Sequence, residues 1–242
     1  MIAIVPVDGL PEIEPGDDIG ALVAAAVELD DGDVVVVAQK IVSKAEGRVV
    51  HLDDVEASER ARELAGEWTD ARELEVILRE SARVVRSRNA LVIAETSHGF
   101  VCASAGVDHS NAPSPHTLVL LPVDPDASAR AIRDSIRIRS GPDVAVVVTD
   151  SFGRPFRKGT TDVAIGVAGL APLRDLRGTP DRAGTLLRST QVALADEIAA
   201  AADLVRAGKD DGRPVVVVRG LEPTGDGTAA DLVMPPDRDL FR

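Results

Sequence analysis

Residues 143–159 read DVAVVVTDSFGRPFRKG, a stretch in which an apolar run meets an aspartate, a hydroxyl group and several basic residues. An apolar run of this kind is typical of a strand that is covered on both faces, as in the middle of a sheet. The run ends at Asp150, so this carboxylate is predicted to lie at the tip of a buried strand. Loops at strand ends often carry functional groups. The stretch therefore predicts a central strand with a site at its end.

Asp150 and Ser151 supply two kinds of oxygen atom at this predicted strand end. A carboxylate in that position commonly holds a hard cation, and the neighbouring hydroxyl offers a second oxygen ligand. The alternative is that Asp150 only caps the turn at Gly153. The local pattern leaves both hypotheses open.

Three basic side chains follow inside a glycine-containing, non-helical segment at 153–169, namely Arg154, Arg157 and Lys158. Guanidinium groups and exposed backbone N–H groups suit the phosphate or carboxylate groups of a ligand. The segment is not a Walker A loop, because Lys158 precedes the glycine that should come before it. A basic turn that contacts only solvent is the alternative.

A second group of polar side chains occurs at 104–111, SAGVDHSN. Asp108 could pair with Asp150 around a divalent cation, although the same residues also suit an Asx-type turn. His109 is not expected to bind zinc, because neither a second histidine at ligand spacing nor a cysteine lies near it. His51, His98 and His116 are expected to be surface residues in turns.

Lys40 and Lys44 stand four residues apart in QKIVSKAEGR, residues 39–48. On a helical turn both side chains would face the same way. No acidic residue compensates them locally before Glu46, which suggests that they contact phosphate. The alternative is an ordinary helix start exposed to solvent.

The remaining pattern predicts strands that alternate with helices. Because 91–106 is hairpin-like, we expect an α+β or mixed fold rather than a doubly wound one. No linker or repeat marks a boundary, so residues 1–242 are predicted to form one domain. The predicted strands are 2–7, 31–39, 90–95, 99–106, 117–123, 143–150 and 213–220, and the predicted helices are 19–29, 54–66, 70–88, 124–140 and 179–208, the last capped by Thr179 and Pro180 and ended by Gly208.

Composition excludes several classes of function. The net charge of -13 argues against general binding to nucleic acid or to anionic membranes, and 2% aromatic residues argue against a platform for single-stranded nucleic acid. The single cysteine, Cys102, cannot form an internal disulfide and is expected to be a small core residue. No serine-nucleophile motif, signal peptide or membrane-length apolar run is present, so we expect a cytoplasmic protein.

Five segments closely resemble the F420 gamma-glutamyl ligase family, whose members are coenzyme F420-0:L-glutamate ligases. They occur in the family's order and spacing, and the resemblance runs from about residue 2 to 234. The segments read VPVDGLPEIEPGDD, VVVVAQKIVSKAEGR, AGVDHSN, VVVTDSFGRPFRKGTTDVAIGVAGLAPLRDLRG and, from residue 195, ADEIAAAADLV with GRPVVVVRG after it.

The resemblance implies an unusual α+β fold that forms an intertwined homodimer. It also implies a GTP-dependent ligase that uses two divalent cations, Mg²⁺ or Mn²⁺, with K⁺ as a further candidate cofactor. Such an enzyme phosphorylates the terminal carboxylate of F420-0, and the amino group of L-glutamate then displaces phosphate, with GDP as the other product. Further additions would build gamma-linked glutamates.

The resemblance also assigns residues in this sequence. Asp108 and Asp150 match the family's metal-binding aspartates at the catalytic centre, and Ser151 matches a ligand of the second metal. The positions that match contacts to GTP are Leu10, Pro11, Glu12, Ile13, Gln39, Lys44 and Asn111, to which the phosphate argument adds Lys40. Arg154, Arg157 and Lys158 are assigned to phosphate or carboxylate groups of the substrates.

The chain departs from the family pattern in places. Gly208 stands where the family usually has a side chain near the second metal, and Thr160 stands where a glutamine is expected. The nitroreductase-like C-terminal domain of some bacterial relatives is not expected here. Two other functions stay open on the residues alone: a metal-dependent, nucleotide-using ligase for another carboxylate acceptor, and a non-catalytic protein that binds an acidic cofactor.

Overall fold

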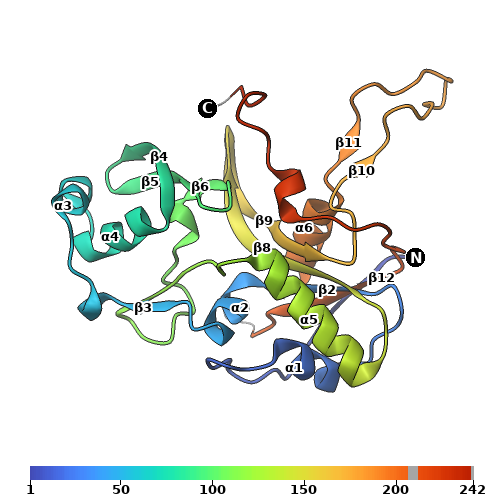
Figure 1. The fold of residues 1–242 in the computed structure, drawn as a ribbon, viewed down its shortest axis with the longest axis horizontal. Coiled ribbons are helices and arrows are strands. Elements are labelled where there is room, and N and C mark those ends of the chain that lie inside the picture. The colour runs from blue at the N-terminus through green and yellow to red at the C-terminus, as the bar shows by residue number, and fades with distance from the viewer. Residues whose placement is uncertain (207–211, 241–242) are drawn as a thin grey trace.

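The computed structural model describes residues 1–206 and 212–240, and its largest sheet is a mixed sheet of five strands (Figure 1). The strands lie in the order β1, β12, β2, β8, β9. β2 and β8 are parallel, and the other neighbours are antiparallel. The bounds are β1 Ala3–Pro6, β2 Val34–Ala38, β8 Ala145–Arg154, β9 Arg157–Ala168 and β12 Val215–Arg219. This mixed sheet with helices confirms the predicted α+β class.

The sheet is buried because its central strands are apolar on both faces. One face packs against α1 (Ile19–Ala26), α2 (Gln39–Ala45) and α5 (Pro125–Ser140). The other face packs against α6 (Leu194–Arg206). The strand positions alternate between the two apolar clusters, so that side chains on β8 point to opposite faces in turn.

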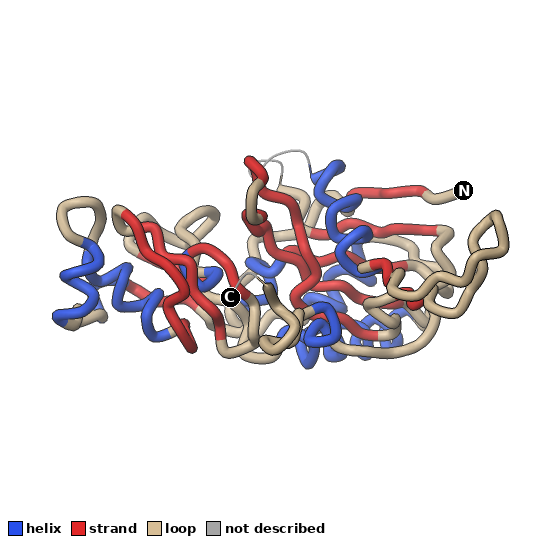
Figure 2. The backbone as a smooth tube through the Cα atoms, turned by 90° about the horizontal axis from the view of Figure 1, so that it is seen from above, coloured by secondary structure: helices blue, strands red, loops and turns tan. Residues whose placement is uncertain are grey.

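A smaller sheet lies at the other end of the molecule (Figure 2). It contains β4 (Ser81–Arg88), β5 (Leu91–Thr96) and β6 (Val101–Ala103), and it shares a separate apolar cluster with α3 (Glu59–Ala65) and α4 (Ala71–Arg79). Between the two sheets β3 (Val49–His51) pairs with β7 (Thr117–Val119). Short 3-10 turns cover Leu52–Asp54, Ser104–Gly106 and Ala229–Leu232.

The predicted helix at 70–88 is wrong in its second half, which forms β4. Asn89 and Ala90 have φ of 50° and 63°, the left-handed conformation of both central residues in a two-residue hairpin turn. This turn pairs Arg88 with Leu91 and joins β4 to β5. The predicted helix at 54–66 begins later, at Glu59, after its N-cap Ser58.

The predicted long helix at 179–208 is also wrong at its start. Residues 174–192 form an arm that projects from the sheet, with β10 (Arg174–Asp175) paired to β11 (Gln191–Val192) at its base (Figure 1). Asp181 accepts hydrogen bonds from the backbone of Ala183 and Thr185, which makes a turn in place of the predicted helix start. The predicted end at Gly208 lies outside the described residues.

The segment predicted as a glycine-containing loop is the second half of a long hairpin formed by β8 and β9. Asp150 therefore lies within β8 and not at its tip, and it does not cap a turn at Gly153. Close packing holds this hairpin: a Cβ on Gly166 would lie 2.3 Å from the carbonyl oxygen of Pro125, so no larger residue fits there. Within the part of the chain that is described, no helix has the length and apolarity needed to cross a bilayer.

Candidate functional site

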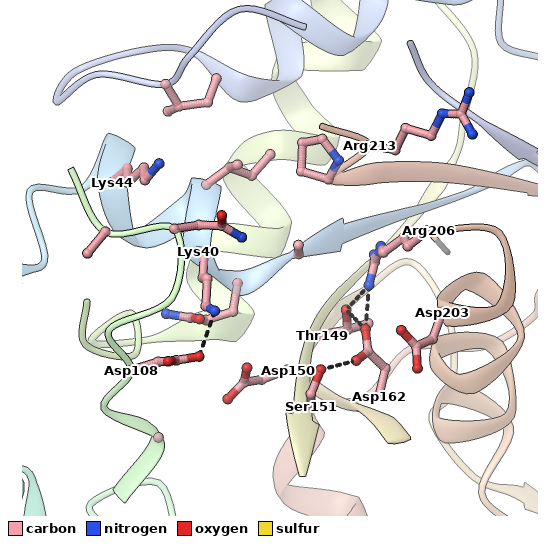
Figure 3. Close-up of a pocket in the computed structure, with 18 of the residues that line it drawn as sticks. Lys40, Lys44, Asp108, Thr149, Asp150, Ser151, Asp162, Asp203, Arg206 and Arg213 are labelled. Atoms are coloured by element: carbon pink, nitrogen blue, oxygen red, sulfur yellow. Dashed lines mark hydrogen bonds and ion pairs between the residues drawn. The ribbon is translucent and has the colours of Figure 1, made fainter. Parts of the chain in front are cut away.

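A cavity of about 1220 Å³ lies where the smaller sheet meets the edge of the larger one. Its walls come from the loop after β1, from α2, from the segment around β6, from the middle of the β8–β9 hairpin and from the end of α6 (Figure 3). Segments that are far apart in the sequence thus meet at one place. The site residues that line it are Leu10, Pro11, Glu12, Ile13, Gln39, Lys40, Lys44, Asp108, Asn111, Asp150 and Ser151.

Strand pleating sends the polar side chains of β8 to two sides of the cavity floor. Asp150 points toward Asp108, whereas Thr149 and Ser151 point toward Asp162 on β9 (Figure 3). The hairpin register pairs Ser151 directly with Asp162, so their side chains lie on one face of the hairpin.

Asp150 is a partly buried carboxylate that forms no ion pair with any residue the structure describes. Burial raises the pKa of Asp150 to about 7, and the charges of Asp162 and Asp108 act in the same direction. A backbone hydrogen bond from Ser151 and the charge of Lys40 lower it only in part. The carboxylate is therefore a site of uncompensated negative charge when ionised.

Asp108 is held in a different way. Its Oδ1 accepts the backbone N–H of Ser110 at 2.8 Å, which is the predicted Asx-type turn, and its Oδ2 accepts Lys40 Nζ at 2.6 Å. Burial alone would raise the pKa of Asp108, but the hydrogen bonds from Lys40 and Ser110 lower it to about 2. Asp108 thus stays ionised. It forms the Asx-type turn and also lines the cavity, so the two predictions for this residue do not exclude each other.

Lys40 and Lys44 lie on α2, as predicted, and both line the cavity. Their acids come from distant segments rather than from α2 itself, since Lys40 pairs with Asp108 and Lys44 with Glu12. The prediction that no acid compensates them therefore needs this correction. Gln39 is 2% exposed, and its Nε2 donates to Ser43 Oγ at 2.6 Å and to the Leu120 carbonyl at 2.8 Å. Both amide hydrogens are thus used inside the protein.

Arg154, Arg157 and Lys158 do not line the cavity. They lie exposed at the tip of the β8–β9 hairpin, where Arg154 Nη2 donates to the Lys158 carbonyl at 3.3 Å. The structure of the single chain thus separates these three side chains from Asp108 and Asp150. The glycine-containing segment that suggested a ligand loop is the turn of this hairpin followed by strand β9.

A buried network that the sequence pattern did not predict lies beside Ser151 and is formed by Thr149, Asp162 and Arg206. Asp203 and Arg213 also line the cavity. The sequence feature that could have indicated this network is Asp162, a charged residue next to an apolar run in TTDVAIGVAG. A charge inside a buried strand requires a partner.

Neither Cys102 nor His109 offers a nucleophile or a zinc site. Cys102 is 5% exposed, as predicted, and burial together with the charge of Asp150 raises the pKa of its thiol to about 12. His109 lies outside the cavity wall, 3.0 Å from Glu73. His51 and His116 are exposed as predicted, although His51 ends strand β3 and does not lie in a turn. His98 is partly buried, with Nε2 3.0 Å from the Pro122 carbonyl.

The donor atoms fit a hard cation in kind, because carboxylate and hydroxyl oxygens are the ligands that Mg²⁺ and Mn²⁺ prefer. The uncompensated charge of Asp150 is the observation that favours a cation there. No group of three acidic, histidine or cysteine side chains is gathered closely enough to hold a metal alone within residues 1–206 and 212–240. Oxygen atoms of a substrate or of water would have to complete the coordination.

Comparison with known proteins assigns the chain to a family. The model of the F420-0:Gamma-glutamyl ligase family matches residues 9–220. A protein of Methanopyrus kandleri named Coenzyme F420:L-glutamate ligase is 45% identical over 100% of this chain and 98% of its own length. Proteins of the same name from Methanothermobacter thermautotrophicus and Archaeoglobus fulgidus are 42% and 39% identical, over 100% of this chain and 99% and 96% of their lengths. The chain therefore belongs to the F420-0:gamma-glutamyl ligase family.

Proposed function

We propose that this protein joins L-glutamate to coenzyme F420-0 through an amide bond, with GTP as the phosphoryl donor. Family membership and the names of the relatives support the ligation itself. The site supports the use of a nucleotide, because two lysines and a pair of aspartates share one large cavity. The further addition of gamma-linked glutamates by the same chemistry belongs to the proposal.

The proposed reaction has two steps. A carboxylate oxygen of F420-0 attacks the γ-phosphorus of GTP, so that the new O–P bond replaces the bond to GDP. The amino nitrogen of L-glutamate then attacks the acyl carbon, the C–O bond to phosphate breaks, and the nitrogen loses a proton. Neither step needs a protein nucleophile, which agrees with the buried, protonated state of Cys102.

The chain's own residues bind and orient the reactants in this proposal. Lys40 and Lys44 project from one helix into the cavity and would neutralise phosphate oxygens. Asp108, Asp150 and Ser151 would hold Mg²⁺ or Mn²⁺. When bound, such cations offset the negative charge shared by the phosphates and the attacking carboxylate.

One observation carries this proposal more than any other: Asp150 faces Asp108 across the cavity without a basic partner among the described residues (Figure 3). Bringing two carboxylates together costs free energy in the empty protein, because their charges repel each other. A protein that only bound an anionic cofactor would gain from removing this repulsion. A cation-dependent ligase, in contrast, needs both carboxylates to bind its cation.

Mass spectrometry of the products tests the function. Purified protein with F420-0, L-glutamate, GTP and Mg²⁺ or Mn²⁺ is expected to give F420-0 extended by glutamate, with equal amounts of GDP and phosphate for each addition. Asp150→Asn and Asp108→Asn should give none. Asp196→Asn is a matched control, because Asp196, in the first turn of α6, accepts the backbone N–H of Ala164 on β9 and does not line the cavity.

The rival functions predict other outcomes. Binding of F420-0 without GTP turnover would support a non-catalytic protein. GTP turnover with glutamate and a different carboxylate acceptor, but not with F420-0, would support another ligase. Glutamate addition that persists in Asp150→Asn would contradict the assigned site while leaving the reaction in place.

We also propose a homodimer, as expected for this family. Light scattering on the purified chain should then give twice the mass of one protomer. A monomer that is fully active would contradict this part of the proposal without affecting the reaction.

A further inference from the structure

The carboxylate of Asp162 is the centre of a buried hydrogen-bond network beside the cation site proposed above. Asp162 is 4% exposed. Its Oδ1 accepts the hydroxyl of Ser151 at 2.6 Å, and its Oδ2 accepts the hydroxyl of Thr149 at 2.9 Å and Arg206 Nη1 (Figure 3). Both oxygens of one carboxylate are therefore occupied by donors from β8 and α6.

The direction of each hydrogen bond in this network is fixed by chemistry. Arginine has only donors, so the 2.8 Å contact from Arg206 Nη1 to Thr149 Oγ1 places an arginine hydrogen on the threonine oxygen. The threonine hydroxyl then has its own hydrogen available for Asp162. An ionised carboxylate only accepts, so Ser151 must donate its hydrogen to Oδ1.

Arg206 also balances the charge of Asp162. Its side chain is 11% exposed, and a second nitrogen, Nη2, donates to the Val36 carbonyl at 3.3 Å. The charges of Asp162 and Arg206 cancel each other. Asp162 differs in this respect from Asp150, which has no ion-pair partner among the described residues. Asp162 is thus held away from the role of a cation ligand even though it lines the same cavity.

We infer that Asp162 is a positioning residue that turns the Ser151 hydroxyl so that its oxygen lone pairs, and not its hydrogen, face the cavity. This inference rests on the proposed function, in which Ser151 binds a divalent cation. A hydroxyl whose hydrogen is already donated attracts a cation and does not donate to a phosphate oxygen. Asp162 thereby decides which kind of ligand Ser151 takes, and Arg206 keeps Asp162 in place for that task.

A double-mutant cycle on Mn²⁺ binding tests the inference. Free Mn²⁺ is measured by electron paramagnetic resonance in the presence of GTP and without acceptor, so the readout does not depend on activity. Asp162→Leu combined with Arg206→Met removes the acceptor without leaving a buried charge, since an apolar pair often replaces a buried ion pair at little cost. Affinity for Mn²⁺ should fall about tenfold, the usual effect of losing an outer partner of a metal ligand.

The same pair of substitutions in a Ser151→Ala background should cause no further loss, because Asp162 acts through the serine hydroxyl. If the apolar pair does not fold, Asp162→Asn with Arg206→Gln provides a second cycle that retains hydrogen-bonding groups. This second pair should reduce the affinity for Mn²⁺ less than the apolar pair does. The reduction should also vanish in the Ser151→Ala background. Asp196→Asn, in the first turn of α6, should leave Mn²⁺ affinity unchanged.

Three outcomes would overturn the inference. Unchanged Mn²⁺ affinity in the folded apolar pair means that Asp162 does not orient Ser151. A loss of the same size with and without Ser151 means that Asp162 acts on the fold as a whole. If the unaltered protein binds no Mn²⁺ with GTP present, the proposed function fails and this inference fails with it, whereas the first two outcomes leave the proposed function standing.

Discussion

Two carboxylates in the β8–β9 hairpin, Asp150 and Asp162, stand in opposite electrostatic states. Asp162 lies on the face toward α6, where a buried arginine balances its charge and two hydroxyls donate to its oxygens. Asp150 lies on the other face, toward Asp108, with no ion pair among the described residues and a pKa raised by burial to about 7.

The difference separates what the fold needs from what a ligand needs. A buried charge with a full set of partners stabilises one arrangement of the chain, and it has little left to offer a ligand. A buried charge without partners costs free energy until something binds it, so it marks a functional site. One hairpin thus supplies both kinds of carboxylate.

The largest expected effect is the loss of activity in Asp150→Asn. The amide keeps the shape but not the charge, so the cation-dependent step should slow by at least about 10³-fold, equivalent to about 4 kcal/mol. The rate of glutamate addition to F420-0 measures it. A loss below about tenfold would mean that Asp150 does not carry the charge that the site requires.

Removal of Asp162 should have its main effect on stability. Asp162→Leu alone removes the hydrogen-bonded counterion of the buried Arg206 and should cost about 3–5 kcal/mol in the free energy of unfolding. Urea denaturation measures it, and the double variant with Arg206→Met should recover most of the loss. If Asp162→Leu is as stable as the unaltered protein, Asp162 does not differ from Asp150 in the way proposed here.

Asp150→Asn should stabilise the cation-free protein, and the gain should depend on pH. The pKa of Asp150 rises from 3.8 to about 7 on folding, so the native state holds a proton that the unfolded state has lost between these values. Stability due to this group is therefore complete below pH 4 and is lost as the pH rises through 7. Above pH 7 the variant should gain about 2 kcal/mol, less than the full shift implies because solvent reaches the side chain.

Thermal or urea denaturation at pH 4.5 and pH 8 tests that dependence. The gain should be large at pH 8 and small at pH 4.5, and added Mg²⁺ should reduce it by stabilising only the unaltered protein. The same gain at both pH values would show that Asp150 is not an uncompensated charge.

The smallest effect is expected at the hairpin tip. Arg157 is exposed and outside the cavity of its own chain, so Arg157→Ala should change the rate of glutamate addition by less than about threefold. A much larger loss with unchanged stability would instead show that the tip reaches a substrate, for example in the cavity of a second copy.

The sequence predicted the local parts of this site well. The apolar run before Asp150 forms the predicted central strand, and Lys40 and Lys44 share one helix, because short-range periodicity determines both. The same reasoning failed at 81–88, where the spacing of apolar residues suited a helix but the turn at Asn89 and Ala90 favoured a strand. The conformation of this turn therefore outweighed the helical spacing of the apolar residues.

The ion pair between Asp162 and Arg206 could not be predicted in the same way. The two residues are 44 positions apart, and they meet only because the hairpin register and the packing of α6 bring them together. The pairing of Lys44 with Glu12 likewise joins segments 32 positions apart. Local pattern identifies which residues are polar in a buried strand, but their partners depend on the tertiary fold.

The most direct test of the central claim is the titration of Asp150 itself, followed by the carboxyl ¹³C shift in aspartate-labelled protein and assigned with Asp150→Asn. In the cation-free protein the pKa should be about 7, well above the ordinary 3.8. With Mg²⁺ it should fall by several units, because a bound cation favours the ionised form. A pKa near 4 without cation, or one near 7 that Mg²⁺ does not move, would contradict the claim that Asp150 is the uncompensated charge of a cation site.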